Sequence, residues 1–335
     1  MSSLLNIRDL SVHFPVPRSV ADFLVAAPRQ LVRAVNGVTL ELAQGQTLGL
    51  VGESGCGKST LGRAVLRLTQ ATAGDVVFDG RSVLGLQGDS LLAFRRRAQM
   101  VFQDPHASMN PKLTVGQTIG EVLRVHRLCP KEEIDRRVGE LMERVGLTAD
   151  LIERKPAGLS GGQCQRVGIA RALAVGPDLI IADESVSALD VSIQAQILNL
   201  FLELQRDLNL TMVFISHDLS VVRHMCQMVA VMYLGRIVEY GPSEEVFRHP
   251  QHPYTQALIE AIPVMAPDAR LSDHLPKGEP PSPLQMPLGC PFHPRCPHAM
   301  PVCQADPAPP GFRVDTQTVH CHLYAPDIRS SAAAD

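Results

Sequence analysis

Residues 52–60 have the types and spacing needed to hold a chain of phosphates. Gly52, Gly57, Lys58 and Ser59 match the pattern Gly-x-x-x-x-Gly-Lys-Ser/Thr. Glycines let the backbone wrap an anion with successive N–H groups pointing inward. Lys58 should reach the outer phosphates of a nucleotide, and the Ser59 hydroxyl should bind Mg²⁺. The predicted nucleotide-binding residues are Gly52, Glu53, Ser54, Gly55, Cys56, Gly57, Lys58, Ser59 and Thr60.

The segments around this loop are those that the mechanism requires. The apolar run 47–51 precedes it as a predicted strand, and Leu61, Val65 and Leu68 follow at helical spacing. A helix that begins near Lys58 presents its positive end to the same anion. A glycine-rich turn without a ligand is the alternative, and it does not require this strand and helix.

Two acidic residues, Asp183 and Glu184, follow the short apolar run 179–182, which predicts a buried strand. Acids at such a position are costly unless they have a partner or a function. We expect Asp183 to hold Mg²⁺ and Glu184 to polarise the attacking water as a general base. The alternative is a helix cap by Asp183 with Glu184 solvated.

Composition and pattern set the class of protein. The chain has 335 residues, 45% hydrophobic and 19% charged, with a net charge of -3, which argues against binding of nucleic acid. No apolar run reaches the roughly 18 residues of a membrane span, and the N-terminus lacks the apolar core of a secretory signal. Predicted strands at 38–42, 76–78, 100–102, 211–215 and 228–233 alternate with helical patterns at 114–147 and 192–208, which is typical of an α/β protein.

A third motif, Leu-Ser-Gly-Gly-Gln at residues 159–163, opens a further helical pattern. Here the chain resembles the ATP-binding subunits of ABC transporters, over residues 4–265. Gln103 matches the family's switch glutamine, which also contacts Mg²⁺, and His217 its switch histidine. Ser187, Ala188, Leu189 and Asp190 match its dimer loop. Ser160, Gly161, Gly162 and Gln163 match its signature.

The resemblance implies a P-loop ATPase domain at residues 1–262, with a RecA-like core, a β-subdomain and a helical subdomain at about 104–176. It also implies that two such domains pair head to tail, each ATP lying between one phosphate loop and the other chain's signature. The residues support this independently, because a second anion-binding helix start is redundant unless it serves another nucleotide. Glu184, His217 and Gln103 then carry hydrolysis.

Five single residues are ambiguous or unusual. Phe14 could stack on adenine, with Phe23 as a competing candidate and core packing as the alternative for either. His217 could be a hydrogen-bonded structural residue. Ser185 replaces a proline that is usual in the family, and Cys164 stands where many relatives carry arginine.

Three further segments narrow the resemblance to the second ATPase subunit of dipeptide and oligopeptide importers. These segments are residues 102–111, residues 249–258 and the proline-rich extension. The implied partners are a second ATPase subunit, two membrane permeases and an extracytoplasmic peptide-binding protein, with this chain peripheral on the cytoplasmic face of the inner membrane. Nickel or glutathione import is the alternative cargo. A soluble ABC ATPase of DNA repair or translation is the rival class, but such chains usually carry coiled coils or two cassettes.

The extension, residues 263–329, holds four of the eight cysteines: Cys290, Cys296, Cys303 and Cys321. Regular helix or sheet is improbable in its proline-rich part, so any order needs an outside constraint. Four thiolates suit a [4Fe–4S] cluster or zinc. The resemblance favours iron–sulfur, with zinc, free thiols or a disulfide as alternatives. Residues 330–335 should form a disordered tail.

Overall fold

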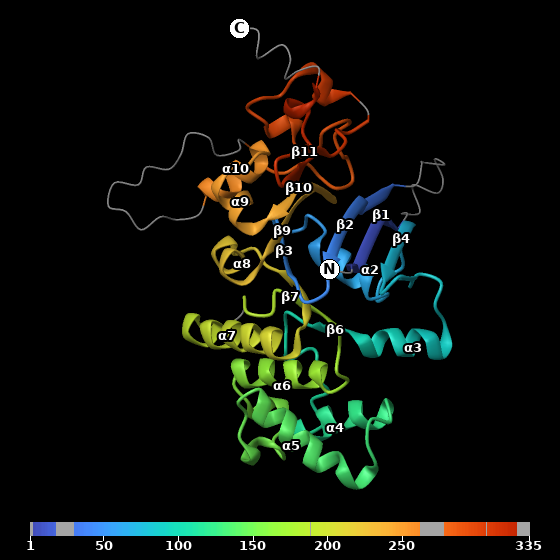
Figure 1. The fold of residues 1–335 in the computed structure, drawn as a ribbon, viewed down its shortest axis with the longest axis vertical. Helices are drawn as coiled ribbons and strands as arrows, with labels where there is room; N and C mark the ends of the chain where they lie inside the picture. Colours follow the sequence, from blue (N-terminus) through green and yellow to red (C-terminus); the bar gives the residue numbers. More distant parts are fainter. Residues whose placement is uncertain (1–2, 18–29, 188, 262–277, 306, 327–335) are drawn as a thin grey trace, which may run out of the picture. The chain divides into compact units, whose positions relative to one another are not determined.

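The computed structural model describes residues 3–17, 30–187, 189–261, 278–305 and 307–326 (Figure 1). The chain forms two compact units and passes between them several times. The first unit contains Met1–Leu5, Leu42–Thr47 and Phe78–Ile215. The second contains Asn6–Glu41, Leu48–Val77 and Ser216–Asp335. Both units combine strands with helices, which confirms the predicted α/β class.

Three parallel strands form the centre of the first unit: β6 (Ala98–Val101), β7 (Leu179–Asp183) and β8 (Thr211–Ile215). Leu179 pairs with Ala98 on one side and with Thr211 on the other. Every residue of β7 and β8 is buried. Their apolar sequences carry no alternation because strands covered on both faces need none. The predicted strands at 179–182 and 211–215 are therefore confirmed.

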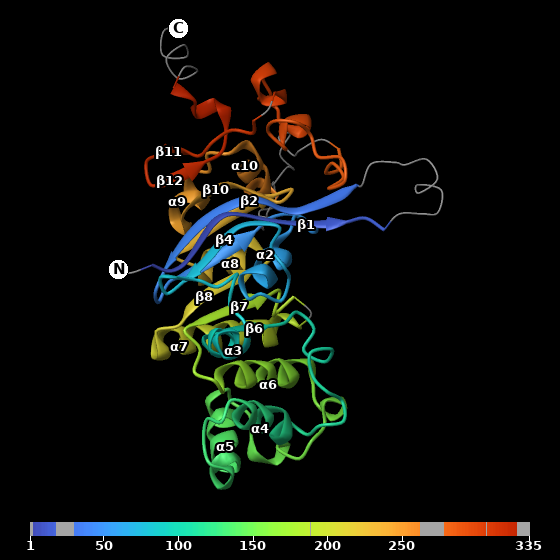
Figure 2. The ribbon, with the colours of Figure 1, turned by 90° about the vertical axis from the view of Figure 1, so that its right-hand side faces the viewer.

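Helices of the first unit bury apolar stripes against one another. Val115, Ile119 and Leu123 recur every four residues and are all buried on α4 (Val115–Val125). This helix packs against α5 (Ile134–Arg144) and α6 (Gly161–Leu173), as Figures 1 and 2 show. The remaining elements are β5 (Arg81–Ser82), α3 (Gly88–Arg97), α7 (Val191–Leu208) and the 3₁₀ turns η1 (Lys131–Glu133), η2 (Ala149–Leu151) and η3 (Pro156–Gly158).

The second unit contains two groups of strands. One group is β2 (Leu31–Ala43), β1 (Ser3–Pro15) and β4 (Ala73–Phe78), in that order across the sheet. In the other, β3 (Thr47–Val51) runs parallel to β9 (Met228–Tyr233), which pairs antiparallel with β10 (Arg236–Pro242). Leu234 and Gly235 join β9 to β10 with φ of 42° and 80°, as a tight hairpin turn with two left-handed residues requires. Its helices are α2 (Lys58–Val65), α8 (Leu219–Met225), α9 (Ser243–Arg248) and α10 (Pro253–Glu260).

The C-terminal segment joins the second unit by adding strands to it. β12 (Gln317–Val319) pairs antiparallel with β10, with Val319 opposite Glu239, and β11 (Phe312–Val314) pairs with β12. Before these strands, the described residues among 278–311 contain only the 3₁₀ turns η4 (His293–Arg295) and η5 (Pro301–Gln304), as the prolines predicted; η6 (His322–Tyr324) follows the strands. The predicted tail, residues 330–335, lies outside the described residues. None of the described helices is long and apolar enough for a bilayer crossing.

Candidate nucleotide-binding and hydrolysis site

The loop at residues 52–60 connects β3 to α2, and its glycines are required by its shape. Gly52 and Gly57 have φ of 148° and 108°. A Cβ atom on Gly52 would lie 2.1 Å from the carbonyl oxygen of Met232, and one on Gly57 would lie 2.0 Å from that of Ala34. At Gly55, φ is 78° and a Cβ atom would meet nothing within 4 Å. The backbone is thus packed from behind and open at Gly55, as an anion-binding loop needs.

Lys58 is the first residue of α2 and is 4% exposed. Its Nζ atom donates hydrogen bonds to the carbonyl oxygens of Gly52, at 2.8 Å, and Glu53, at 3.0 Å. These bonds fold the side chain back over the loop and hold the ammonium group beside the helix N-terminus. Both positive features therefore face the same small volume.

Cys56 supports this loop through its backbone. Its carbonyl oxygen accepts a hydrogen bond of 2.8 Å from the amide of Gly235, in the turn between β9 and β10. Burial raises the pKa of the Cys56 thiol, and the neighbouring Lys58 offsets this only in part. The thiol is therefore neutral at physiological pH.

Two other predicted residues also belong to the second unit. Phe14 lies near the end of β1 and is 42% exposed. Core packing is therefore the wrong interpretation of Phe14, and its ring remains available for stacking. His217 is exposed and follows β8 by two residues. The competing candidate, Phe23, lies outside the described residues.

In the first unit, Gln103 and Glu184 lie in contact. Nε2 of Gln103 donates a hydrogen bond of 2.9 Å to Oε2 of Glu184. Asp183, the last residue of β7, is buried, whereas Glu184 takes a left-handed φ of 43°. The Glu184 amide donates to the carbonyl oxygen of Ile215 at 3.0 Å. A left-handed backbone is strained for a residue other than glycine, and such strain concentrates at functional sites.

The signature residues form a capped helix start. Ser160 is the exposed N-cap of α6: its Oγ atom accepts from the amide of Gln163, and its own amide donates to Oε1 of Gln163 at 2.9 Å. A Cβ atom on Gly162 would lie 2.5 Å from Cγ2 of Ile193 in α7, so glycine is required there. This reciprocal capping leaves other N–H groups of the first turn to bind an external anion.

The predicted residues thus fall into two sets. Residues 52–60, Phe14 and His217 belong to the second unit. The first unit holds Gln103, Asp183, Glu184, the signature residues 160–163, and Ser187, Leu189 and Asp190 of the predicted dimer loop. Ala188 lies outside the described residues.

Known proteins are similar to this chain over most of its length. The ABC transporter family matches residues 35–187, and the oligopeptide/dipeptide transporter C-terminal region matches residues 238–303. The oligopeptide transport ATP-binding protein OppF of Escherichia coli is 51% identical over 90% of this chain and 90% of its own length. A probable peptide ABC transporter ATP-binding protein of Sinorhizobium fredii is 49% identical over 97% and 91%. The chain belongs to the ABC transporter family.

Solved structures agree with this membership. The ABC transporter cassette MJ0796, solved as a dimer, is 27% identical, with a TM-score of 0.63, over 71% of this chain and 98% of its own. CbiO1 of Clostridium perfringens, part of an ABC transporter complex, is 27% identical, with a TM-score of 0.62, over 74% and 92%. The P-loop ABC ATPase fold and ATPase activity expected from the sequence are therefore confirmed.

The four cysteines of this ABC ATPase's extension are all free thiols. The Cys290 amide donates to the carbonyl oxygen of Cys303 at 2.9 Å. Burial raises the pKa of Cys290 to about 11 and that of Cys321 to about 12, and the nearby Cys296 and Cys303 add to both shifts. Across residues 278–326 and the rest of the described chain, no group of three or more His, Cys, Asp or Glu side chains is placed to hold a metal ion.

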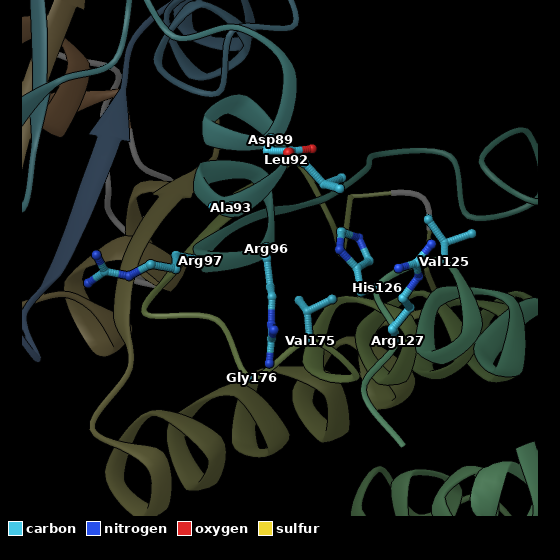
Figure 3. A pocket seen from close by; sticks show the side chains of 10 residues that line it. All are labelled: Asp89, Leu92, Ala93, Arg96, Arg97, Val125, His126, Arg127, Val175 and Gly176. Atoms are coloured by element: carbon cyan, nitrogen blue, oxygen red, sulfur yellow. The ribbon is translucent and has the colours of Figure 1, made fainter. Parts of the chain in front are cut away.

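A pocket of about 700 Å³ in the first unit contains none of the predicted site residues. It lies among α3, the end of α4 and residues 175–176 (Figure 3). Arg96, His126 and Arg127 surround it, with Asp89 at its rim, whereas Arg97 points away toward Asp79 and Asp178. Burial and the neighbouring Arg96 lower the pKa of His126. The positive charge of the pocket therefore comes from its arginines.

Sequence reasoning missed the residues that hold Glu53 within the phosphate loop. The Tyr254 hydroxyl accepts from the Glu53 amide at 2.9 Å, and Arg295 forms an ion pair with the Glu53 carboxylate. Tyr254 belongs to segment 249–258, whose sequence resembles that of the peptide importers. That resemblance was the only indication from the sequence that Tyr254 has a role. Arg295 carried none, since it lies far along the chain among prolines.

Proposed function

We propose that this chain is the ATP-hydrolysing subunit of a bacterial importer of dipeptides or oligopeptides. The observation that carries the proposal is that two helices, which begin at Lys58 and at Gly161, follow glycine-containing motifs whose residues suit an anion. The cargo class is supported by residues 238–303, which match the oligopeptide/dipeptide transporter C-terminal region, and by relatives named for oligopeptide transport.

In this proposal, each ATP lies between the phosphate loop of one ATPase subunit and the signature of another. Lys58, Ser59, Gln103 and Asp183 bind the phosphates and Mg²⁺, and Glu184 polarises the water with His217 beside the γ-phosphate. ATP favours the closed pair because only in that state does the nucleotide contact both the phosphate loop and the signature. Hydrolysis then lets the two subunits separate. The pair is a heterodimer with a second ATPase subunit, on the cytoplasmic face of the inner membrane.

The signature can be tested separately from the phosphate loop. Ser160→Ala should weaken ATP-dependent pairing with the second subunit by at least about 10-fold, because it removes the cap and the hydroxyl at α6. The isolated chain should bind ATP as before, since that site is built from residues 52–60. Thr114→Ala is the matched control: Thr114 caps α4 with the same reciprocal pattern to Gln117. Equal loss of pairing in both variants would contradict the signature role.

The cargo is tested with the intact transporter in proteoliposomes containing ATP. Uptake of a labelled tripeptide, dependent on the binding protein and abolished by Glu184→Gln, is the expected result. Uptake of nickel or glutathione without peptide uptake would show that the proposed cargo is wrong and would leave the ATPase role unchanged. Failure to copurify with any permease would favour a soluble ABC ATPase instead.

The permeases require a docking surface, and we assign it to the pocket that Arg96 and Arg127 line. Its positive charge suits an acidic permease segment. Arg96→Glu with Arg127→Glu should abolish recovery of the complex from detergent-solubilised membranes. Arg206→Glu, on the exposed face of α7, is the control. Normal recovery of the doubly substituted complex would exclude this surface.

We also propose that Cys290, Cys296, Cys303 and Cys321 hold a [4Fe–4S] cluster, with zinc as the alternative. Support comes from the four cysteines of one segment, none of which forms a disulfide. When bound, such a group would fix a proline-rich segment that has few regular hydrogen bonds. Brown colour and stoichiometric iron after anaerobic purification are expected. A colourless, iron-free and fully active protein would rule the cluster out, and bound zinc would favour the alternative.

A further inference from the structure

Arg295 of the cysteine-containing extension contacts the phosphate loop. Its Nη1 atom donates to Oε1 and Oε2 of Glu53, at 3.1 Å and 3.0 Å. The Arg295 side chain is 8% exposed and that of Glu53 is 27% exposed. Ion pairs exposed to water contribute little, but removing one partner of a buried pair leaves an uncompensated charge. The pair of Arg295 and Glu53 is shielded from water enough that removing one partner should have a measurable energetic cost.

An aromatic cluster fixes the position of Arg295. The guanidinium carbon lies 5.9 Å from the ring centroid of Tyr233. Phe292, three residues before Arg295, is fully buried and packs edge-on against Tyr233, with centroids 5.3 Å apart, and against Tyr254 at 5.4 Å. The extension is therefore anchored to β9 and α10 immediately beside the arginine.

Glu53 is held at three points. Its amide donates to the hydroxyl of Tyr254, its carboxylate pairs with Arg295, and its carbonyl oxygen accepts from Nζ of Lys58. The last bond joins this residue to the lysine that should reach the outer phosphates. A displacement of Glu53 would therefore also displace the backbone that wraps the nucleotide and the support of Lys58.

The charge of Glu53 matters as well as its position. A carboxylate inside a phosphate-binding loop repels the phosphates, and this repulsion is strong where water is partly excluded. Arg295 neutralises that carboxylate. Arginine suits the task because it is always charged and is weakly hydrated.

We infer that Arg295 is a positioning residue for ATP binding, which makes the extension a structural part of the nucleotide site. It acts through Glu53: it holds the first side chain of the phosphate loop in place and cancels its charge. The inference rests on residues 52–60 being the ATP site, and it does not require that the cysteines hold a metal.

The test measures the affinity for Mg-ATP of the full-length chain in a Glu184→Gln background, which prevents turnover. Arg295→Met should raise the dissociation constant at least about 10-fold, whereas Arg295→Lys should lose less affinity, because it keeps the charge but not the planar group beside Tyr233. The loss in Arg295→Met should change only modestly with salt, because salt screens a partly buried repulsion less than one between exposed charges. Arg313→Met, an exposed arginine of the same extension, is the matched control.

A double-substitution cycle separates the charge effect from general damage. Glu53→Gln combined with Arg295→Met leaves neither charge, so the double variant should bind Mg-ATP more tightly than Arg295→Met alone. If Arg295 only stabilised the fold, the double variant would bind no better, and its melting temperature would fall at least as far. Affinity of Arg295→Met within twofold of the parent, or no coupling with Glu53, would overturn the inference. Absence of ATP binding by the parent would instead contradict the assignment of the loop.

Discussion

Nε2 of Gln103 donates a hydrogen bond of 2.9 Å to Oε2 of Glu184, so the residue expected to sense Mg²⁺ contacts the expected general base directly. The contact joins a residue that follows β6 to one that follows the neighbouring strand β7. Parallel strands bring their carboxyl ends to the same edge of a sheet, so the two side chains meet although 81 positions separate them.

Glu184→Gln should keep ATP binding and reduce hydrolysis by at least about 10²-fold, because the amide is not basic enough to polarise water. The left-handed backbone and the hydrogen bond to Ile215 do not depend on the carboxylate, so the fold should persist. Steady-state phosphate release and nucleotide binding measure the two effects. Glu153→Gln, at an exposed position, is the control. Unchanged turnover would remove Glu184 from the base role.

Lys58→Met should weaken ATP binding by about 10²-fold or more, since it removes the only cation that this loop itself supplies to the phosphates. Methionine fills much of the buried volume of Lys58, so the melting temperature should change little although ATP binding is weakened strongly. Equilibrium binding of a fluorescent ATP analogue provides the measurement. Lys112→Met removes an exposed lysine and should bind like the parent. An equal loss in both variants would point to net charge rather than to Lys58.

Gly162→Ala should destabilise the protein by about 1–3 kcal/mol, because the new methyl group meets the stiff β-branched side chain of Ile193 at 2.5 Å. Gly168→Ala in the same helix is the matched control. Its Cβ atom meets nothing within 4 Å, so it should stabilise α6 by about 0.5–1 kcal/mol. Urea denaturation followed by circular dichroism distinguishes them. Similar changes in the two variants would show that α7 does not constrain Gly162.

Acid should weaken the fold through His252, the N-cap of α10. Its Nδ1 atom accepts from the Tyr254 amide at 3.0 Å, which requires an unprotonated nitrogen. Complete burial, with a smaller effect of His320, lowers the pKa of His252 to about 3. The stabilisation is thus present above the unfolded pKa of about 6.5 and is lost as the pH falls toward 3.

This residue should contribute a loss of about 2 kcal/mol between pH 6.5 and pH 5. His252→Asn keeps a capping oxygen but cannot take up a proton there, so its free energy of unfolding should fall less over that range. The comparison of the two proteins by urea denaturation at both pH values removes the shared effect of other histidines. Parallel pH profiles would contradict the prediction.

The sequence predicted the parts whose chemistry requires neighbouring residues. The phosphate loop, the signature and Asp183–Glu184 are short runs whose residue types and spacing are enough to predict a site, and their roles remain predictions. The strands β7 and β8 were also predictable because strands buried on both faces are uniformly apolar.

Contacts across long separations could not be predicted. Arg295 and Glu53 lie 242 positions apart, and no periodicity marks either of them. Strands β11 and β12 are too short to give an alternating pattern, and their pairing with β10 depends on an edge that only the folded unit presents. The proline-rich composition correctly excluded long elements in residues 278–311 but did not reveal this strand addition.

The addition of β12 to β10 also bears on how the protein avoids self-association. An uncovered strand edge offers unpaired N–H and C=O groups on which another chain can build a sheet. Here Glu239 and Tyr240 of β10 are paired with Val319 and Thr318, and the outermost strand is the three-residue β11. So short an edge is a poor template for another chain, so the extension should lower the tendency of this protein to aggregate.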